Sequence, residues 1–212
     1  MTGTVADVLT FPLEPVATPE ADSAVREPRE AAEVEGWLAG ARAGEQAAFG
    51  CLVDLYQRVA VRTALVALGR MEDAEDVAQE AFLIAWRKLD AFRGDSTFRT
   101  WLLTIVWRKA LDRRRSRMLW WRRTAVQSDA GPFEDVPAPS ASPERSAVAR
   151  DAMQRARREI SRLSPTLRDT LLLAATGEHT YEEIASVLGT PIGTIKWRVA
   201  EARRKLGERL AR

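Results

Sequence analysis

The sequence contains very little cysteine and histidine. Among its 212 residues there is one cysteine, Cys51, and one histidine, His179. One cysteine excludes a disulfide within the chain, and the two residues together cannot supply the four ligands of a structural zinc site. A single histidine also argues against catalysis by an imidazole base, and no Walker-type phosphate loop is present. We therefore expect no metal, no cofactor and no enzymatic activity.

Long apolar runs and alternating strand patterns are absent as well. No segment approaches the roughly 20 apolar residues of a membrane span, and the start MTGTVADVLTFPLEPV lacks the basic stretch of a signal peptide. We expect a cytoplasmic protein without membrane insertion. Because the apolar residues recur with helical spacing, the expected fold class is all-α, with two helical domains joined by a flexible linker.

Charge is distributed unevenly, although the formal net charge is only +2. Residues 1–43 carry a net charge of −5, whereas residues 107–123 carry +7 and residues 192–212 carry +5. Two separate basic segments favour two contacts with a polyanion such as nucleic acid. Solvated helix faces are the alternative explanation for both segments.

Composition divides the chain into four parts. Residues 1–30 are rich in Pro, Glu and Ala, which predicts a disordered acidic tail. Residues 31–123 and 147–212 show helical periodicity and form the two predicted domains. Residues 124–146 contain four prolines and a net charge of −3, which is typical of a linker.

The first domain has an acidic, an aromatic and a basic part. A predicted helix at 71–89 begins with acids, which suit the positive end of a helix dipole. A Gly-Asp-Ser loop at 92–98 follows, and Ser96 or Thr97 can cap the next helix. That helix has an apolar stripe that begins at Phe98, and its C-terminal part is strongly basic.

The most informative motif is TYEEIASVLGTPIGTIKWRVAEARRKL, residues 180–206. Five residues mark its helix ends: Thr180, Glu183, Gly189, Thr190 and Pro191. The first pair is a capping box, the glycine suits a left-handed helix end, and the last pair predicts a threonine cap followed by proline at the first helical position. The motif predicts a helix-turn-helix; a plain helical hairpin with a basic face is the alternative.

The second helix of such a motif enters a major groove with its N-terminal residues toward the bases. Lysine and arginine there can bind guanine or phosphate. Trp197 has two possible roles, a contact with a DNA sugar or thymine methyl and a cover for the core. His179 is interpreted as a loop or cap residue. The candidate DNA-binding residues are Thr194, Lys196, Trp197, Arg198, Glu201 and Arg203.

Two blocks resemble a known family. The segment DAEDVAQEAFLIAWRKLDAFRGDSTFRTWLLTIVWRKALDRRRSR, residues 73–117, resembles the second domain of the extracytoplasmic-function sigma factors of bacterial RNA polymerase, and residues 161–206 resemble their fourth domain. The resemblance implies a factor that recruits core RNA polymerase through the β′ clamp helices and the β flap, recognises two promoter elements and helps to open DNA. It also implies an anti-sigma factor as a partner.

The resemblance also implies roles for residues of the first domain. The polymerase-binding candidates are Asp73, Glu75, Asp76, Gln79 and Glu80. At the minus-ten element, aromatic rings can stack on unpaired bases and basic side chains can hold phosphates. The minus-ten candidates are Phe92, Ser96, Thr97, Trp107, Arg108, Lys109, Arg113, Arg114 and Arg115.

The sequence departs from the family pattern at two DNA-facing positions. Arg108 stands where many members have Asn, and Glu201 stands where many have Arg, so the bases read by this chain are less predictable than its fold. The aromatic-basic segment MLWWRR, residues 118–123, has no assigned role. A stand-alone helix-turn-helix regulator is the alternative function, although the block at 45–117 favours the sigma factor.

Overall fold

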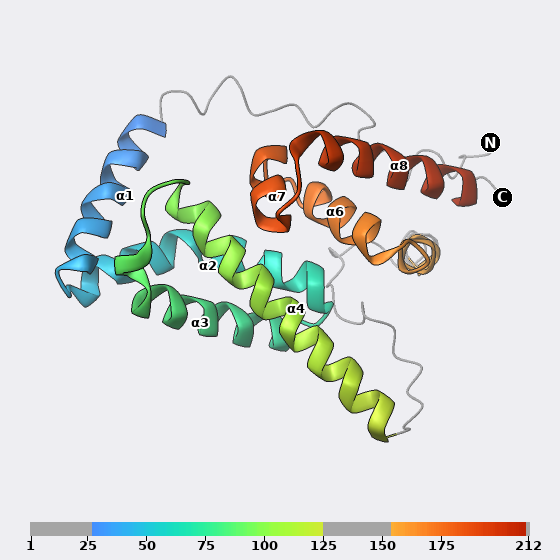
Figure 1. Ribbon diagram of the computed structural model, residues 1–212, viewed down its shortest axis with the longest axis horizontal. Helices are drawn as coiled ribbons and strands as arrows, with labels where there is room; N and C mark the ends of the chain where they lie inside the picture. Colours follow the sequence, from blue (N-terminus) through green and yellow to red (C-terminus); the bar gives the residue numbers. More distant parts are fainter. Residues whose placement is uncertain (1–26, 125–153, 211–212) are drawn as a thin grey trace, which may run out of the picture.

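The computed structural model describes residues 27–124 and 154–210. Within these ranges all regular structure is helical, which confirms the predicted all-α fold (Figure 1). Most of the predicted acidic tail and nearly all of the predicted linker lie outside the described residues. No described helix is both long and apolar enough to cross a membrane.

The first domain consists of four α-helices and a short 3-10 turn. In chain order they are α1 (Glu27–Arg42), α2 (Gln46–Leu68), α3 (Met71–Arg87), η2 (Leu89–Ala91) and α4 (Phe98–Thr124). The first helix begins inside the segment predicted as a tail, so the helical part of the chain starts about one turn earlier than residue 31.

Local sequence explains where these helices begin and end. Gly69 has a left-handed backbone, with φ of 72°, and its N–H donates to the Leu65 carbonyl at 2.8 Å, which closes α2. At the start of α4, the Thr100 N–H donates to Thr97 Oγ1 at 3.2 Å. This bond confirms that a residue of the predicted pair, Thr97, caps the helix.

The second domain contains a helical segment at 154–161, followed by α6 (Pro165–Ala175), α7 (Tyr181–Leu188) and α8 (Ile192–Leu210). Ser164 and Pro165 take the predicted cap and first positions of α6. A small cluster holds α6 against α8, with Leu163, Leu167 and Leu171 packed on Ala202. Figure 1 shows α8 lying along α6, with α7 at their end nearest to α4.

The two domains pack against each other. One hydrophobic cluster includes Leu102 and Val106 of α4 together with Ile184, Val187 and Ile195 of the second domain. Helix α7 contacts α4, and α6 contacts α2. The described parts of the chain therefore form a single packed body, with the helix-turn-helix next to the first domain (Figure 1).

Candidate nucleic-acid interface

The predicted capping box is present at the start of α7. The Glu183 N–H donates to Thr180 Oγ1, and the Thr180 N–H donates to Glu183 Oε2, both at 3.1 Å. Gly189, with φ of 60° and ψ of 42°, ends the helix in the left-handed region as predicted. Ile195 of α8 is completely buried in the core. These contacts hold α7 and α8 as the two helices of a helix-turn-helix.

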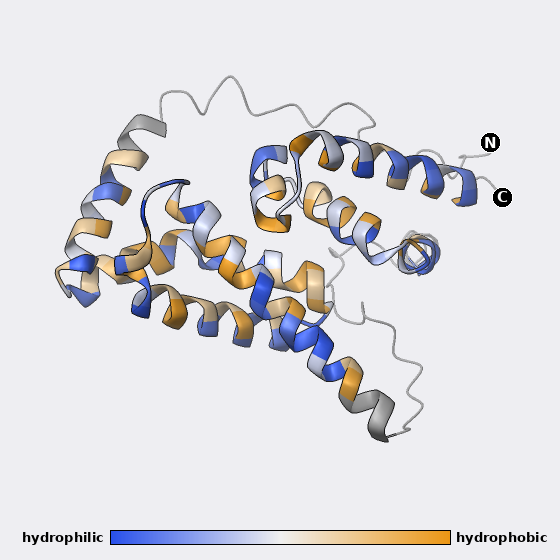
Figure 2. Cartoon of the chain, viewed as in Figure 1, coloured by the Kyte–Doolittle hydropathy of each residue, from blue (hydrophilic) through white to orange (hydrophobic). Residues whose placement is uncertain are grey.

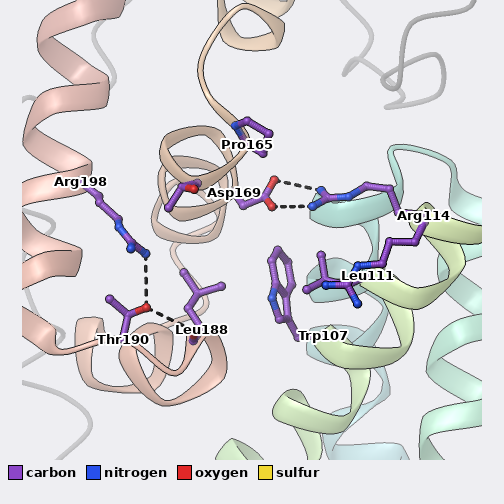
Figure 3. Close-up of a pocket in the computed structure, with 10 residues that line it drawn as sticks. Trp107, Leu111, Arg114, Pro165, Asp169, Leu188, Thr190 and Arg198 are labelled. Carbon is purple, nitrogen blue, oxygen red and sulfur yellow. Dashed lines mark hydrogen bonds and ion pairs between the residues drawn. The ribbon is translucent and has the colours of Figure 1, made fainter. Parts of the chain in front are cut away.

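The predicted cap of α8 is wrong by one residue. The Pro191 carbonyl accepts the first helical bonds, from Thr194 N at 2.9 Å and Ile195 N at 3.2 Å, so Pro191 is the cap and α8 begins at Ile192. The Thr190 hydroxyl instead donates to the Leu188 carbonyl at 3.2 Å and accepts from Arg198 Nη1 at 3.3 Å (Figure 3). Thr190 thus closes the turn and holds Arg198 beside it.

Two of the six predicted DNA-binding residues of α8 are exposed, and the other four are half-buried. Lys196 is exposed, and Trp197 is 62% exposed, so this tryptophan does not cover the core. Thr194, Arg198 and Arg203 are half-buried. An exposed indole beside an exposed lysine can contact a DNA sugar, a thymine methyl and a phosphate at one place.

Glu201 is engaged within its own helix. It accepts two hydrogen bonds of 2.8 Å from Arg204, and Lys205 lies 3.4 Å from the same carboxylate. These hydrogen bonds, chiefly those from Arg204, lower the pKa of Glu201 to about 2. Glu201 therefore positions Arg204 and Lys205 on the same helix, and its contact with a cytosine stays a prediction.

Two of the predicted minus-ten aromatics lie in the core. Phe92 is 7% exposed and packs edge-on against Phe98 with ring centroids 5.8 Å apart, and Trp107 is 3% exposed. Phe92 follows η2 and packs within the first domain, whereas Trp107 of α4 lies in the wall of a cleft between α4 and the second domain. Neither ring is accessible to a base in this arrangement, and the stacking of Phe92 and Trp107 on unpaired bases stays a prediction. Ser96 and Thr97 are exposed in the loop.

A strongly hydrophilic stretch of α4 precedes an apolar turn near the end of the helix (Figure 2). Arg108, Arg113 and Arg115 are exposed, whereas Lys109 and Arg114 are half-buried. Lys109 Nζ lies 2.8 Å from Glu80. Arg114 makes a two-pronged ion pair with Asp169 of the second domain, at 3.1 and 2.9 Å.

The acidic side of α3 lies directly beside this basic side of α4. Arg117 Nη1 is 2.8 Å from Asp73, and Arg113 Nη2 is 3.2 Å from Asp76. Together with the Lys109–Glu80 pair, these contacts join residues predicted to bind polymerase to residues predicted to bind DNA. Arg117 was missed by the sequence analysis, although its spacing of four residues from Arg113 was a signal for a shared helix face.

The two remaining polymerase-binding candidates, Glu75 and Gln79, are exposed on α3, as is Asp76. The structure therefore offers an open acidic patch on α3, a row of ion pairs, and then a basic edge on α4. The helix-turn-helix lies on the other domain. Among the described residues no cluster of histidine, cysteine and acidic side chains is arranged to hold a metal ion.

Comparison with known proteins gives the family. Residues 52–119 match Sigma-70 region 2, and residues 153–206 match Sigma-70 region 4. The ECF RNA polymerase sigma-E factor of Escherichia coli K12 is 32% identical over 174 residues, which cover 79% of this chain and 88% of the relative. The chain belongs to the ECF sigma factors. It directs RNA polymerase to promoters.

Other relatives agree with this assignment. The ECF sigma factor SigW of Bacillus subtilis is 29% identical over 170 residues, covering 79% of this sigma factor and 91% of SigW. The structure of the sigma factor RpoE from Bartonella quintana, in complex with the anti-sigma factor NepR, superposes with a TM-score of 0.59 at 27% identity. The superposition covers 77% of this sigma factor and 96% of RpoE. Region 2 thus contains α3 and the basic part of α4, and region 4 contains the helix-turn-helix.

Proposed function

We propose that this sigma factor docks on core RNA polymerase through α3 and reads two promoter elements, one with each domain. The observation that carries the proposal is the placement of an exposed acidic patch, a basic helix and a helix-turn-helix on one packed body. Such a factor works by binding and needs no catalysis of its own. We place it in the cytoplasm, where RNA polymerase transcribes the chromosome.

Docking is assigned to the exposed side chains of α3. Glu75, Asp76 and Gln79 are accessible, and carboxylates on a helix suit a basic surface of the β′ clamp helices. Asp73, Asp76 and Glu80 pair with α4 and so also hold α3 and α4 together, while the Asp76 side chain stays 60% exposed and accessible for docking. Region 4 is assigned to the β flap.

Promoter reading is assigned to both domains. At the minus-thirty-five element, Lys196 and Trp197 enter the major groove, with Thr194, Arg198 and Arg203 at its edges. At the minus-ten element, Ser96 and Thr97 face the opened strand. Basic side chains of α4 hold the phosphates of that DNA strand: Arg108, Lys109, Arg113, Arg114 and Arg115. An anti-sigma factor is also proposed, because the RpoE relative was solved in complex with one.

Run-off transcription with core polymerase tests this function. The sigma factor should give promoter-specific products, and Lys196→Ala should reduce them, because this lysine is exposed on the recognition helix. Lys88→Ala is the matched control, since it removes the same charge from an exposed site at the end of α3. Specific duplex binding without any core-dependent product would instead support a stand-alone regulator.

A further inference from the structure

The contact between the two domains separates the charges by sign. Among the described residues, each ion pair between the two domains joins an arginine of the first domain to a carboxylate of the second. There are four of them: Arg58–Glu178, Arg62–Glu178, Arg99–Glu183 and Arg114–Asp169. We call Arg58, Arg62, Arg99 and Arg114 the arginine face, and Asp169, Glu178 and Glu183 the acidic face.

The two faces are closely engaged. The side chains of the acidic face are only 9–19% exposed, although a carboxylate is normally hydrated. Arg99 also donates to the Glu178 carbonyl oxygen, so this arginine holds two neighbouring points of the second domain. In Figure 3, Asp169 points across the cleft with both oxygens toward Arg114. Guanidinium groups bind carboxylate and phosphate with the same two-pronged geometry.

Part of the arginine face lies on the helix that carries the proposed minus-ten side chains. Arg99 and Arg114 belong to α4, whereas Arg58 and Arg62 belong to α2. A cleft of about 370 Å³ separates α4 from the second domain at Arg114 and Arg115, with Trp107 and Leu111 in its wall (Figure 3). The second domain thus covers one flank of the helix that is proposed to hold the opened DNA strand.

We propose that the arginine face is a phosphate-binding surface for promoter DNA, which the acidic face occupies in place of phosphate while the domains are packed together. This inference rests on the proposed function and extends the DNA contact to α2, whose Arg58 and Arg62 no sequence motif implicated. Carboxylates arranged along a neighbouring domain present the same charge as a nucleic-acid backbone. Separation of the domains exchanges one anion for the other.

The test measures binding of the full chain, without polymerase, to a labelled single-stranded DNA oligonucleotide of mixed sequence at low salt. Fluorescence anisotropy gives the affinity. The double variant Asp169→Asn/Glu178→Gln removes two negative charges from the acidic face and keeps the side-chain shapes. It should bind DNA at least about fivefold more tightly than the wild type, since phosphate no longer competes with carboxylate. Glu159→Gln/Glu182→Gln is the matched control, because it also removes two negative charges from the second domain: Glu159 pairs with Arg162 inside that domain, and Glu182 is exposed.

A second variant tests whether the gain in DNA binding depends on the arginine face. Arg58→Gln/Arg62→Gln, added to the double variant, should reverse most of the gain and reduce the salt dependence of binding by about two phosphate contacts. Both arginines lie on the surface, with 75% and 48% of their side chains exposed, so the fold tolerates the change. An unchanged affinity in the first variant, or a gain that survives the arginine replacements, overturns the proposal.

The outcome is separable from that of the proposed function. Promoter-specific run-off products from the wild type, combined with no gain in DNA binding by the double variant, overturn the arginine face alone. Absence of those products with every template overturns the sigma-factor mechanism itself. A gain in affinity that depends on Arg58 and Arg62 supports the arginine face as a DNA-binding surface.

Discussion

The pKa of His179 reports directly on the contact between the two domains. Its Nε2 lies 3.2 Å from Thr63 Oγ1 of α2. The Thr63 hydroxyl donates to the Val59 carbonyl at 2.7 Å, so its oxygen accepts and the imidazole carries its proton on Nε2. Burial, aided by the positive charge of Arg99, lowers the pKa of His179 to about 4, and the nearby Glu178 and Glu183 act in the opposite direction.

The shift makes stability depend on pH. A histidine in the unfolded chain has a pKa of about 6.5, so the unfolded state takes up a proton first as the pH falls. The neutral His179 therefore contributes fully to the stability of the folded state above pH 6.5, and this contribution is lost progressively as the pH falls toward 4. The difference between the two pKa values lowers the free energy of unfolding by about 2 kcal/mol at pH 5 and by at most about 3 kcal/mol at lower pH.

Proton NMR measures this pKa without ambiguity, because the sequence has a single histidine. In the untagged protein the imidazole C–H resonance should stay in its neutral position down to about pH 5. His179→Gln should show a smaller loss of unfolding free energy between pH 7 and pH 5 than the wild type, by about 2 kcal/mol. A titration midpoint near 6.5 would show a solvated ring, which refutes the packing of α2 against the 176–180 turn.

Three further predictions concern other parts of the molecule. Ile195→Ala should lower the free energy of unfolding by about 2–4 kcal/mol, because it leaves a cavity in a fully buried site; urea denaturation checks this, and a loss below about 1 kcal/mol would contradict the packing. Lys196→Ala should weaken binding of the holoenzyme to promoter DNA by about 1–3 kcal/mol, measured against Lys88→Ala, and equal affinities would show that the recognition helix is misassigned. Asp76→Arg should weaken binding to core polymerase while the chain remains folded; a normal affinity would count against docking through α3.

Sequence patterns predicted the features that depend on neighbouring residues. The Thr180–Glu183 capping box and the Gly189 helix end are local, because each involves bonds within four residues. Thr190 was misplaced because its hydroxyl has a competing partner, Arg198, eight residues away.

Burial and domain contacts were harder to predict. The basic and aromatic residues of α4 share one helix, and periodicity alone did not show that Phe92 and Trp107 turn inward. The ion pairs of the arginine face join residues 55 to 120 positions apart, across a segment that carries no pairing signal. The ion pairs between α3 and α4 were easier to predict, because acidic residues on α3 and basic residues on α4 recur at intervals of three or four positions.

The most direct test of the central claim is to map transcript starts from reconstituted RNA polymerase. Core enzyme should be incubated with genomic DNA fragments, with and without this sigma factor, and the 5′ ends of the products should be sequenced. We predict a set of starts that depends on the sigma factor and lies downstream of two shared sequence elements, one for each domain. Identical starts with and without the protein would contradict the assignment.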